Sequence, residues 1–319
     1  MWASSLRRRQ ESPISIPWDI GITPLRGNLV TVMGAPGVGK SLFGLNWCLN
    51  VPELSVLVSL DTDMPTQALR ACSILTGASN TDVLENPDGW ARLLERRNLR
   101  CRMYDITMTV KDINDLVLAE TEYWGRAPGL VVVDNVSNMV TEMSYEQFRS
   151  AFIGLQKVAR LRGTVVVALH HVTRGYSSGR LSLHSGSFAG EQESEVVLGL
   201  WRSDLGNLEV GILKNRNGMA DPSGQISYPL TLNHENFRME EGYGNLWKPA
   251  EQHSVLPQPA PPQRQEESDQ EGNLGTTFRL VRTHDGDERG SKSGGEDGRY
   301  VRAPATGDDE DVQDSERAD

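Results

Sequence analysis

Cysteines and long apolar runs are scarce in this chain, and their scarcity excludes several classes of protein. Three cysteines occur in 319 residues, far apart and without the spacing of a metal site. This pattern favours a reducing, intracellular compartment over a secreted, disulfide-linked fold. No apolar run approaches the ~18 residues of a membrane-spanning helix, and the first residues lack the pattern of a signal peptide. We therefore expect a cytoplasmic protein with no membrane partner.

Positive charge is also in deficit, and the deficit is unevenly distributed. The formal net charge is −11. Residues 251–319 contain 8 Lys and Arg against 17 Asp and Glu, a net charge of −9 that leaves −2 for the first 250 residues. The acidic balance is thus a property of the C-terminal part. Without a broad basic surface, any contact with nucleic acid must come from local loops.

What the sequence does contain is a candidate phosphate-binding loop. Residues 34–41, GAPGVGKS, match the pattern G-x-x-x-x-G-K-[ST]. The apolar run 29–33 predicts a strand before the loop, and residues 41–48 predict the start of a helix after it. In this context glycines let successive backbone N–H groups turn toward a phosphate at the positive end of the helix. The context favours ATP binding over a chance glycine-rich turn.

Magnesium ligands are expected beside this loop. The predicted nucleotide contacts are Gly34, Ala35, Pro36, Gly37, Val38, Gly39, Lys40, Ser41 and Leu42. The Lys40 ammonium supplies a point charge for the outer phosphates, and the Ser41 hydroxyl is a ligand for Mg²⁺. A second support for the metal is expected at Asp134, where the apolar strand 130–134 ends in a carboxylate.

Hydrolysis of ATP also needs a carboxylate that orients or deprotonates the attacking water. Asp61 and Asp63 follow the buried strand 55–60, at the sheet edge where phosphates bind in such folds. Either carboxylate suits this role while the other caps the next helix, and we favour Asp61 slightly. His170 and His171 end the strand 164–169 at the same edge. They are either turn residues or a sensor of the γ-phosphate.

Two further groups of basic residues are candidates for function. Lys214 and Arg216 lie in the segment KNRNG, between two strands predicted to form a hairpin. This pattern is typical of a solvated turn and also of an arginine finger that reaches a neighbouring subunit. Residues 173–190 are rich in Gly, Ser and Arg. Their candidate contacts with single-stranded DNA are Arg174, Arg180, Ser185 and Gly186.

Apolar strands alternate with amphipathic helices along residues 18–248. This alternation predicts an α/β domain with a mostly parallel sheet covered by helices on both sides. One of the helices is expected to begin with a capping box formed by Ser144 and Gln147. Residues 1–17 are expected to be a lead-in. Residues 249–319 are expected to be a disordered acidic tail, because few apolar side chains offset the chain entropy there.

The order of these motifs resembles the RecA-like ATPase core of DnaB-type replicative DNA helicases, including versions carried by bacteriophages. The resemblance runs from about Trp18 to Arg238 and is carried by the phosphate loop and by the segments SLDTDMP, VVVDN, ALHHVTR, SGSFAGEQESEVVLGLWR and LKNRNG. The last two segments discriminate best, because a phosphate loop alone occurs in many families.

The resemblance implies a P-loop ATPase that forms a ring, as a homo-hexamer, and translocates on single-stranded DNA during replication. It implies ATP and Mg²⁺ as cofactors, and a helicase loader or primase as a further partner. Lys214 and Arg216 would reach the neighbouring subunit's nucleotide, and the loop from Arg174 to Gly190 would face DNA. For a phage-encoded protein the location would be the bacterial host cytoplasm.

The sequence departs from this family's pattern in three respects. Asp61 and Asp63 stand where the family has a Glu, a His stands where it has a Gln, and we expect no primase-binding N-terminal domain. Two alternatives stay open. One is a RecA-like recombinase or strand-annealing ATPase that acts as a filament, and the other is a regulatory P-loop ATPase that does not act on DNA.

Overall fold

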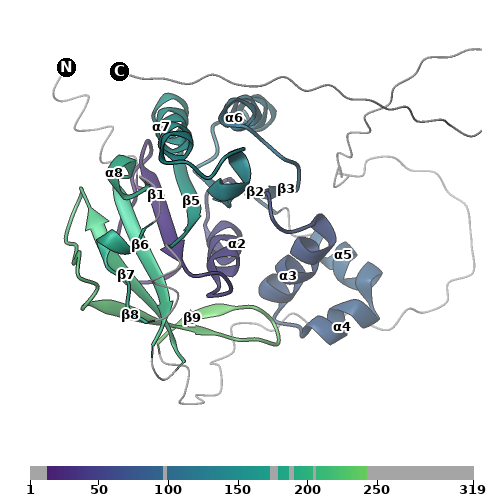
Figure 1. The fold of residues 1–319 in the computed structure, drawn as a ribbon. Helices are drawn as coiled ribbons and strands as arrows, with labels where there is room; N and C mark the ends of the chain where they lie inside the picture. The colour runs from purple at the N-terminus through teal and green to yellow at the C-terminus, as the bar shows by residue number, and fades with distance from the viewer. Residues whose placement is uncertain (1–12, 96–98, 173–178, 187–189, 204–205, 243–319) are drawn as a thin grey trace, which may run out of the picture. The chain divides into compact units, whose positions relative to one another are not determined.

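The sheet at the centre of the fold is mostly parallel, as the alternation of strands and helices predicts. The computed structural model describes residues 13–95, 99–172, 179–186, 190–203 and 206–242 (Figure 1). In these residues the strand order is β3-β2-β4-β5-β1-β6-β7-β8-β9. The pairings from β3 to β6 are parallel, and those from β6 to β9 are antiparallel.

The elements have the following bounds. The strands are β1 (Leu29–Gly34), β2 (Ser55–Ser59), β3 (Cys101–Tyr104), β4 (Leu130–Asp134), β5 (Val165–His171), β6 (Val196–Arg202), β7 (Leu208–Asn215), β8 (Ser227–Leu232) and β9 (Met239–Glu241). The helices are α2 (Lys40–Asn50), α3 (Met64–Thr76), α4 (Asn80–Glu85), α5 (Pro87–Glu95), α6 (Val110–Trp124), α7 (Tyr145–Arg162) and α8 (Gly190–Glu193), with short 3₁₀ turns η1 (Val136–Met139) and η3 (Leu183–Ser185).

Helices cover the parallel part of the sheet on both faces. α2 packs on one face, and α6 and α7 pack on the other (Figure 1). Successive side chains of β4 alternate between the two cores: Leu130 and Val132 join the first, and Val131 and Val133 join the second. A strand that is apolar on both faces needs both covers. The predicted α/β fold with a mostly parallel, helix-flanked sheet is therefore confirmed.

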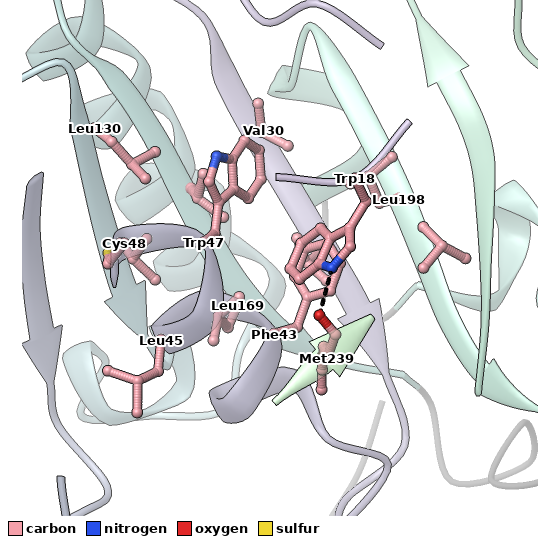
Figure 2. Packing of buried hydrophobic residues seen from close by; sticks show 14 of the residues in the cluster. Trp18, Val30, Phe43, Leu45, Trp47, Cys48, Leu130, Leu169, Leu198 and Met239 are labelled. Atoms are coloured by element: carbon pink, nitrogen blue, oxygen red, sulfur yellow. Dashed lines mark hydrogen bonds between the residues drawn. The ribbon is translucent and has the colours of Figure 1, made fainter. Parts of the chain in front are cut away.

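The N-terminal segment packs into the core earlier than predicted. Ile14 is 2% exposed. The Trp18 ring stacks on Phe43 of α2 with 4.5 Å between ring centroids, and its indole N–H donates to the carbonyl of Met239 (Figure 2). The predicted lead-in, 1–17, thus includes residues that pack against the phosphate-loop helix. Residues 1–12 and the predicted tail, 249–319, lie outside the described residues.

Two local predictions need correction. Ser144 does cap α7 and accepts from the N–H of Gln147, but the Gln147 side chain accepts from Thr141 and Glu142 instead of completing a capping box. Helices α4 and α5 were missed, because segments of six and nine residues are too short to display helical periodicity. Among the described residues, no helix is long and apolar enough to cross a membrane.

Packing of the N-terminal segment should contribute measurably to stability. We expect Ile20→Ala, at a site that is 1% exposed, to lower the free energy of unfolding by about 2–5 kcal/mol, because it removes buried surface and leaves a cavity. The matched change Ile106→Ala, at a site that is 39% exposed, should cost far less. Urea denaturation of the full chain measures both, and equal losses would contradict a packed N-terminal segment.

Candidate functional site

The predicted phosphate loop connects the end of β1 to the start of α2. Gly39, directly before the helix, has φ 115°, a conformation that side chains rarely adopt. A Cβ added at Gly34 would lie 2.8 Å from the carbonyl oxygen of Leu200, so only glycine fits between β1 and β6 at this point. The loop therefore has the strand–loop–helix geometry in which backbone N–H groups and a helix N-terminus face a phosphate.

Lys40 is buried and bonded to the loop itself. Its ammonium group donates to the carbonyls of Gly34 at 2.9 Å and Ala35 at 2.8 Å, and lies 3.2 Å from Nδ1 of His171. Burial lowers the pKa of Lys40 to about 8, although the nearby carboxylates of Asp134 and Asp61 raise it. Phosphate oxygens are better partners for an ammonium group than carbonyls, so bound ATP would draw Lys40 away from the loop.

The two histidines lie on opposite faces of β5. His171 pairs in register with Gly34 of β1, and its Nε2 lies 3.4 Å from Nδ2 of Asn135. Burial, together with the charge of Lys40, lowers the pKa of His171, so its ring is neutral at pH 7. His170 is buried against Phe148 and Phe152 of α7. A sensor role at the phosphate loop is thus supported for His171 only, because alternation along the strand turns His170 away.

Asp134 ends β4 beside the loop, and its surroundings fit a metal ligand. Its carboxylate is 2% exposed and is hydrogen-bonded to the side chain of Ser41. Burial raises the pKa of Asp134, which the Ser41 bond partly offsets. Oδ2 has no hydrogen-bond partner among the described residues. A hydroxyl and a carboxylate oxygen side by side suit Mg²⁺, whose other ligands would come from water and phosphates.

Asp61 and Asp63 occupy different environments. Asp63 is the N-cap of α3, and its side chain accepts from the N–H of Thr66 at 3.3 Å. Asp61 lies near enough to the loop for its charge to raise the pKa values of Lys40 and His171. The carboxylate that faces the phosphate loop is therefore Asp61, and Asp63 has the capping role left open for one of the pair.

Two asparagines were not predicted as part of this site. Asn135 contacts His171, and its Oδ1 accepts from the N–H of Ser137. Asn138 donates to the carbonyl of Leu60, directly before Asp61. Asn135 follows Asp134 in the sequence and was visible in VVVDN. The contribution of Asn138 depends on the 3₁₀ turn η1, which the sequence patterns do not predict.

Arg216 lies at the opposite edge of the sheet from the phosphate loop. It follows Asn215, which pairs with Val196 at the start of β6, and Val196 pairs with Val30 near the start of β1. The loop begins at Gly34, where β1 ends. The exposed side chain of Arg216 is thus separated by most of a strand from its own chain's loop. It does not complete that loop's site within one chain.

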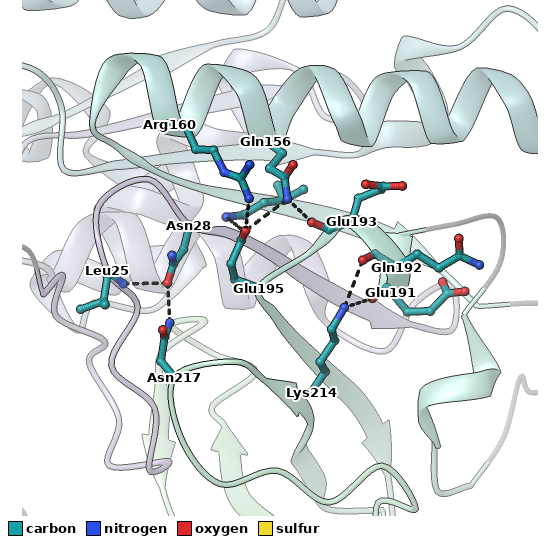
Figure 3. Close-up of polar contacts among 11 residues, drawn as sticks. Leu25, Asn28, Gln156, Arg160, Glu191, Gln192, Glu193, Glu195, Lys214 and Asn217 are labelled. Atoms are coloured by element: carbon teal, nitrogen blue, oxygen red, sulfur yellow. Dashed lines mark hydrogen bonds and ion pairs between the residues drawn. The ribbon is translucent and has the colours of Figure 1, made fainter. Parts of the chain in front are cut away.

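Lys214 has a partner within its own chain. Its ammonium group donates to the carbonyls of Glu191 and Gln192 in α8, at 2.6 and 3.2 Å (Figure 3). Burial, together with the charge of Arg216, lowers the pKa of Lys214. The prediction that Lys214 and Arg216 point together at a neighbouring nucleotide therefore needs revision, because only Arg216 has an exposed side chain.

The predicted DNA contacts differ in accessibility. Arg174 lies outside the described residues, and Arg180 is exposed. Ser185 is 0% exposed, and its Oγ accepts from the N–H of Ser182, so its side chain does not offer a DNA contact. Gly186 forms an isolated bridge with Val172, directly after His171.

This sheet, its phosphate loop and the carboxylate on a neighbouring parallel strand define a P-loop ATPase with a RecA-like fold. A family described as an AAA domain matches residues 7–176, more than half of the chain, and the chain belongs to this family. Membership indicates that the protein binds and hydrolyses ATP. Two relatives are phage proteins, both called gene 65 protein. That of Mycobacterium phage D29 is 32% identical over 213 residues, and that of Mycobacterium phage L5 is 33% identical over 217 residues.

The match to the D29 protein covers 61% of this chain and 91% of the relative, and the match to the L5 protein covers 63% and 81%. Two solved structures have the same fold. One is a DnaB-like replicative helicase solved to show its interactions with primase, with a TM-score of 0.58 and 19% identity. The match covers 67% of this chain and 57% of that one, less than two thirds of its length. The other is a separately solved ATPase domain, with a TM-score of 0.59, 19% identity, and coverage of 68% and 86%.

The pKa of Lys40 predicts how ATP affinity depends on pH. Bound phosphates favour the charged ammonium and so raise its pKa above the value of about 8 in the free protein. Affinity should be full below that value and should fall as the pH rises through it, by up to about tenfold per pH unit. Titration with a fluorescent ATP analogue measures the profile. Lys111→Ala, which changes an exposed lysine, should keep the profile, and Lys40→Ala should bind weakly without this inflection.

The different positions of Asp61 and Asp63 predict different effects of the same substitution. Asp61→Asn should lower kcat for ATP hydrolysis by roughly 10²–10⁴-fold with little change in KM, because it removes the carboxylate that faces the water. Asp63→Asn should keep near-normal turnover, since asparagine caps a helix as well as aspartate does. Steady-state kinetics compare them. A large loss confined to Asp63→Asn would reverse the assignment.

Proposed function

We propose that this protein is an ATP-driven motor that assembles into a ring and translocates on single-stranded DNA, in the manner of a DnaB-like helicase. The observation that carries the proposal is the position of Arg216. It is a planar cation on a held backbone, at the sheet edge away from its own phosphate loop, and so it suits the nucleotide of a second copy. The motif order and the fold shared with DnaB-like ATPase domains support the same assignment.

In the proposed mechanism one subunit binds ATP at Gly34–Leu42. Lys40 exchanges the loop carbonyls for the outer phosphates, and Ser41 and Asp134 hold Mg²⁺, which when bound neutralises phosphate charge. Asp61 orients the attacking water and accepts its proton. Arg216 of the adjacent subunit stabilises the charge that develops on the transferred phosphoryl group. A ring of subunits would then be required for fast hydrolysis.

His171 is proposed to report the γ-phosphate to DNA. Its ring contacts Lys40, so displacement of the Lys40 ammonium by ATP changes the hydrogen bonding of the ring. Val172, the next residue, bridges to Gly186, and the segment before Gly186 carries the exposed Arg180. A change at His171 would therefore reach a basic segment through one residue. Arg180, with Arg174 and the backbone at Gly186, is the proposed DNA contact.

The assembly and its partners follow from the same reasoning. We infer a homo-hexamer acting in the cytoplasm of a bacterial host, since both phage relatives belong to mycobacteriophages. A helicase loader or primase is a proposed partner, because the DnaB-like helicase of the same fold interacts with primase. The domain bounds 18–248, extended toward residue 13, and a separate acidic segment 249–319 are proposed as the organisation of the chain.

Arg216→Ala tests the proposal. Loss of an arginine finger should lower kcat by roughly 10³-fold with ATP binding kept, while the exposed control Arg92→Ala should be neutral. Mixing inactive Arg216→Ala with inactive Lys40→Ala should restore part of the single-stranded-DNA-stimulated turnover, because mixed rings contain interfaces with an intact loop and an intact finger. Strand displacement on forked DNA should require hydrolysable ATP.

Three outcomes would contradict this function. An absence of recovery in mixed assemblies would place Arg216 outside a shared site. Open filaments on DNA in electron micrographs, without strand displacement, would favour the recombinase alternative. ATP turnover that single-stranded DNA leaves unchanged would favour a regulatory ATPase.

A further inference from the structure

The short segment 190–195, which contains α8, is held by hydrogen bonds from three directions. Its partners are Tyr145, Arg149, Gln156 and Arg160 of α7, Leu29 and Thr31 of β1, and Lys214 and Arg216 at the end of β7. The central group is the buried carboxylate of Glu195, which accepts from Arg160 at 2.8 Å (Figure 3). The segment is therefore anchored to the rigid part of the fold.

Arg216 is mounted on this segment. Its backbone N–H donates to the carbonyl of Glu195 at 2.9 Å. The next residue, Asn217, donates to Oδ1 of Asn28, which also accepts from the N–H of Leu25 (Figure 3). The backbone around Arg216 is thus fixed while its side chain is exposed, and its position depends on the position of residues 190–195.

The other end of the segment meets the proposed DNA contact. The Glu191 carboxylate lies 3.2 Å from the position that a Cβ on Gly186 would occupy. Lys214 joins the two regions, because its stem belongs to β7 and its ammonium group bonds to the carbonyls of Glu191 and Gln192. Carbonyls at the end of a one-turn helix lack partners within it, so the ammonium supplies bonds that the helix does not.

We propose that Lys214 is a positioning residue that couples the Gly186–α8 region to Arg216, and that it is not a second finger. This inference rests on the proposed function, in which that region answers to DNA and Arg216 acts on the neighbour's ATP. Movement of α8 on DNA binding is transmitted through the Lys214 ammonium and the Glu195 carbonyl to the end of β7. Arg216 then reaches or leaves the adjacent nucleotide.

The test compares Lys214→Met, Lys214→Arg, Arg216→Ala and the exposed-lysine control Lys111→Met. Lys214→Met should reduce the ratio of DNA-stimulated to basal ATP turnover by roughly fivefold or more, with KM for ATP unchanged. Lys214→Arg, which keeps a cation with several donors, should recover most of the ratio. Arg216→Ala should lower basal and stimulated turnover together, and Lys111→Met should change neither.

Hydrogen exchange of the nucleotide-free protein gives a second readout that needs no DNA. Lys214→Met should raise exchange of amides in residues 190–195 and at Arg216 by roughly tenfold, with β4 and α7 unchanged. Arg216→Ala should leave residues 190–195 protected.

Two results would overturn the inference: unchanged exchange in Lys214→Met, or an unchanged stimulation ratio in a variant whose wild type responds to DNA. If the wild type does not respond to DNA, the proposed function fails. Exchange at residues 190–195 then decides by itself whether Lys214 holds Arg216 in position.

Discussion

The parallel pairing of β1 with both β5 and β6 is the constraint on which the rest of the structure depends. It sets Gly34 beside His171 on one side and Leu200 on the other, so the phosphate loop and the sensor histidine emerge at one edge. The chain reverses after β6, and β7 runs back to the other edge. This reversal carries Arg216 away from its own loop, so one chain holds only part of the proposed site.

Buried charge determines how the nucleotide-free site is held together. Lys40 is charged below pH 8 in a place where burial disfavours charge, and it compensates with two carbonyls and a neutral imidazole. Asp134 is buried in the same region, where its pKa is raised. A metal-bound triphosphate supplies better partners for both groups. The arrangement thus favours ligand binding because the free site leaves its charges less well solvated.

Segments distant in the sequence support the phosphate-loop helix. Asn46 of α2, 1% exposed, accepts from the N–H of Met239 and donates to the carbonyl of Phe237. Arg238 donates to the carbonyl of Ile74 near the end of α3. Trp18 donates to the carbonyl of Met239 from the other end of the domain. The helix that presents Lys40 and Ser41 is therefore positioned by both ends of the described chain.

The sequence by itself determined the strands, the phosphate loop and the fold class, because these depend on local apolar periodicity and on the backbone freedom of glycine. It also located Asp134 and the Asp61/Asp63 pair. Only the tertiary structure separated the members of each pair: Asp61 from the helix cap Asp63, His171 from the core residue His170, and exposed Arg216 from bound Lys214. Adjacent residues share a local pattern, whereas their roles depend on which face of a strand or which neighbouring element each side chain meets.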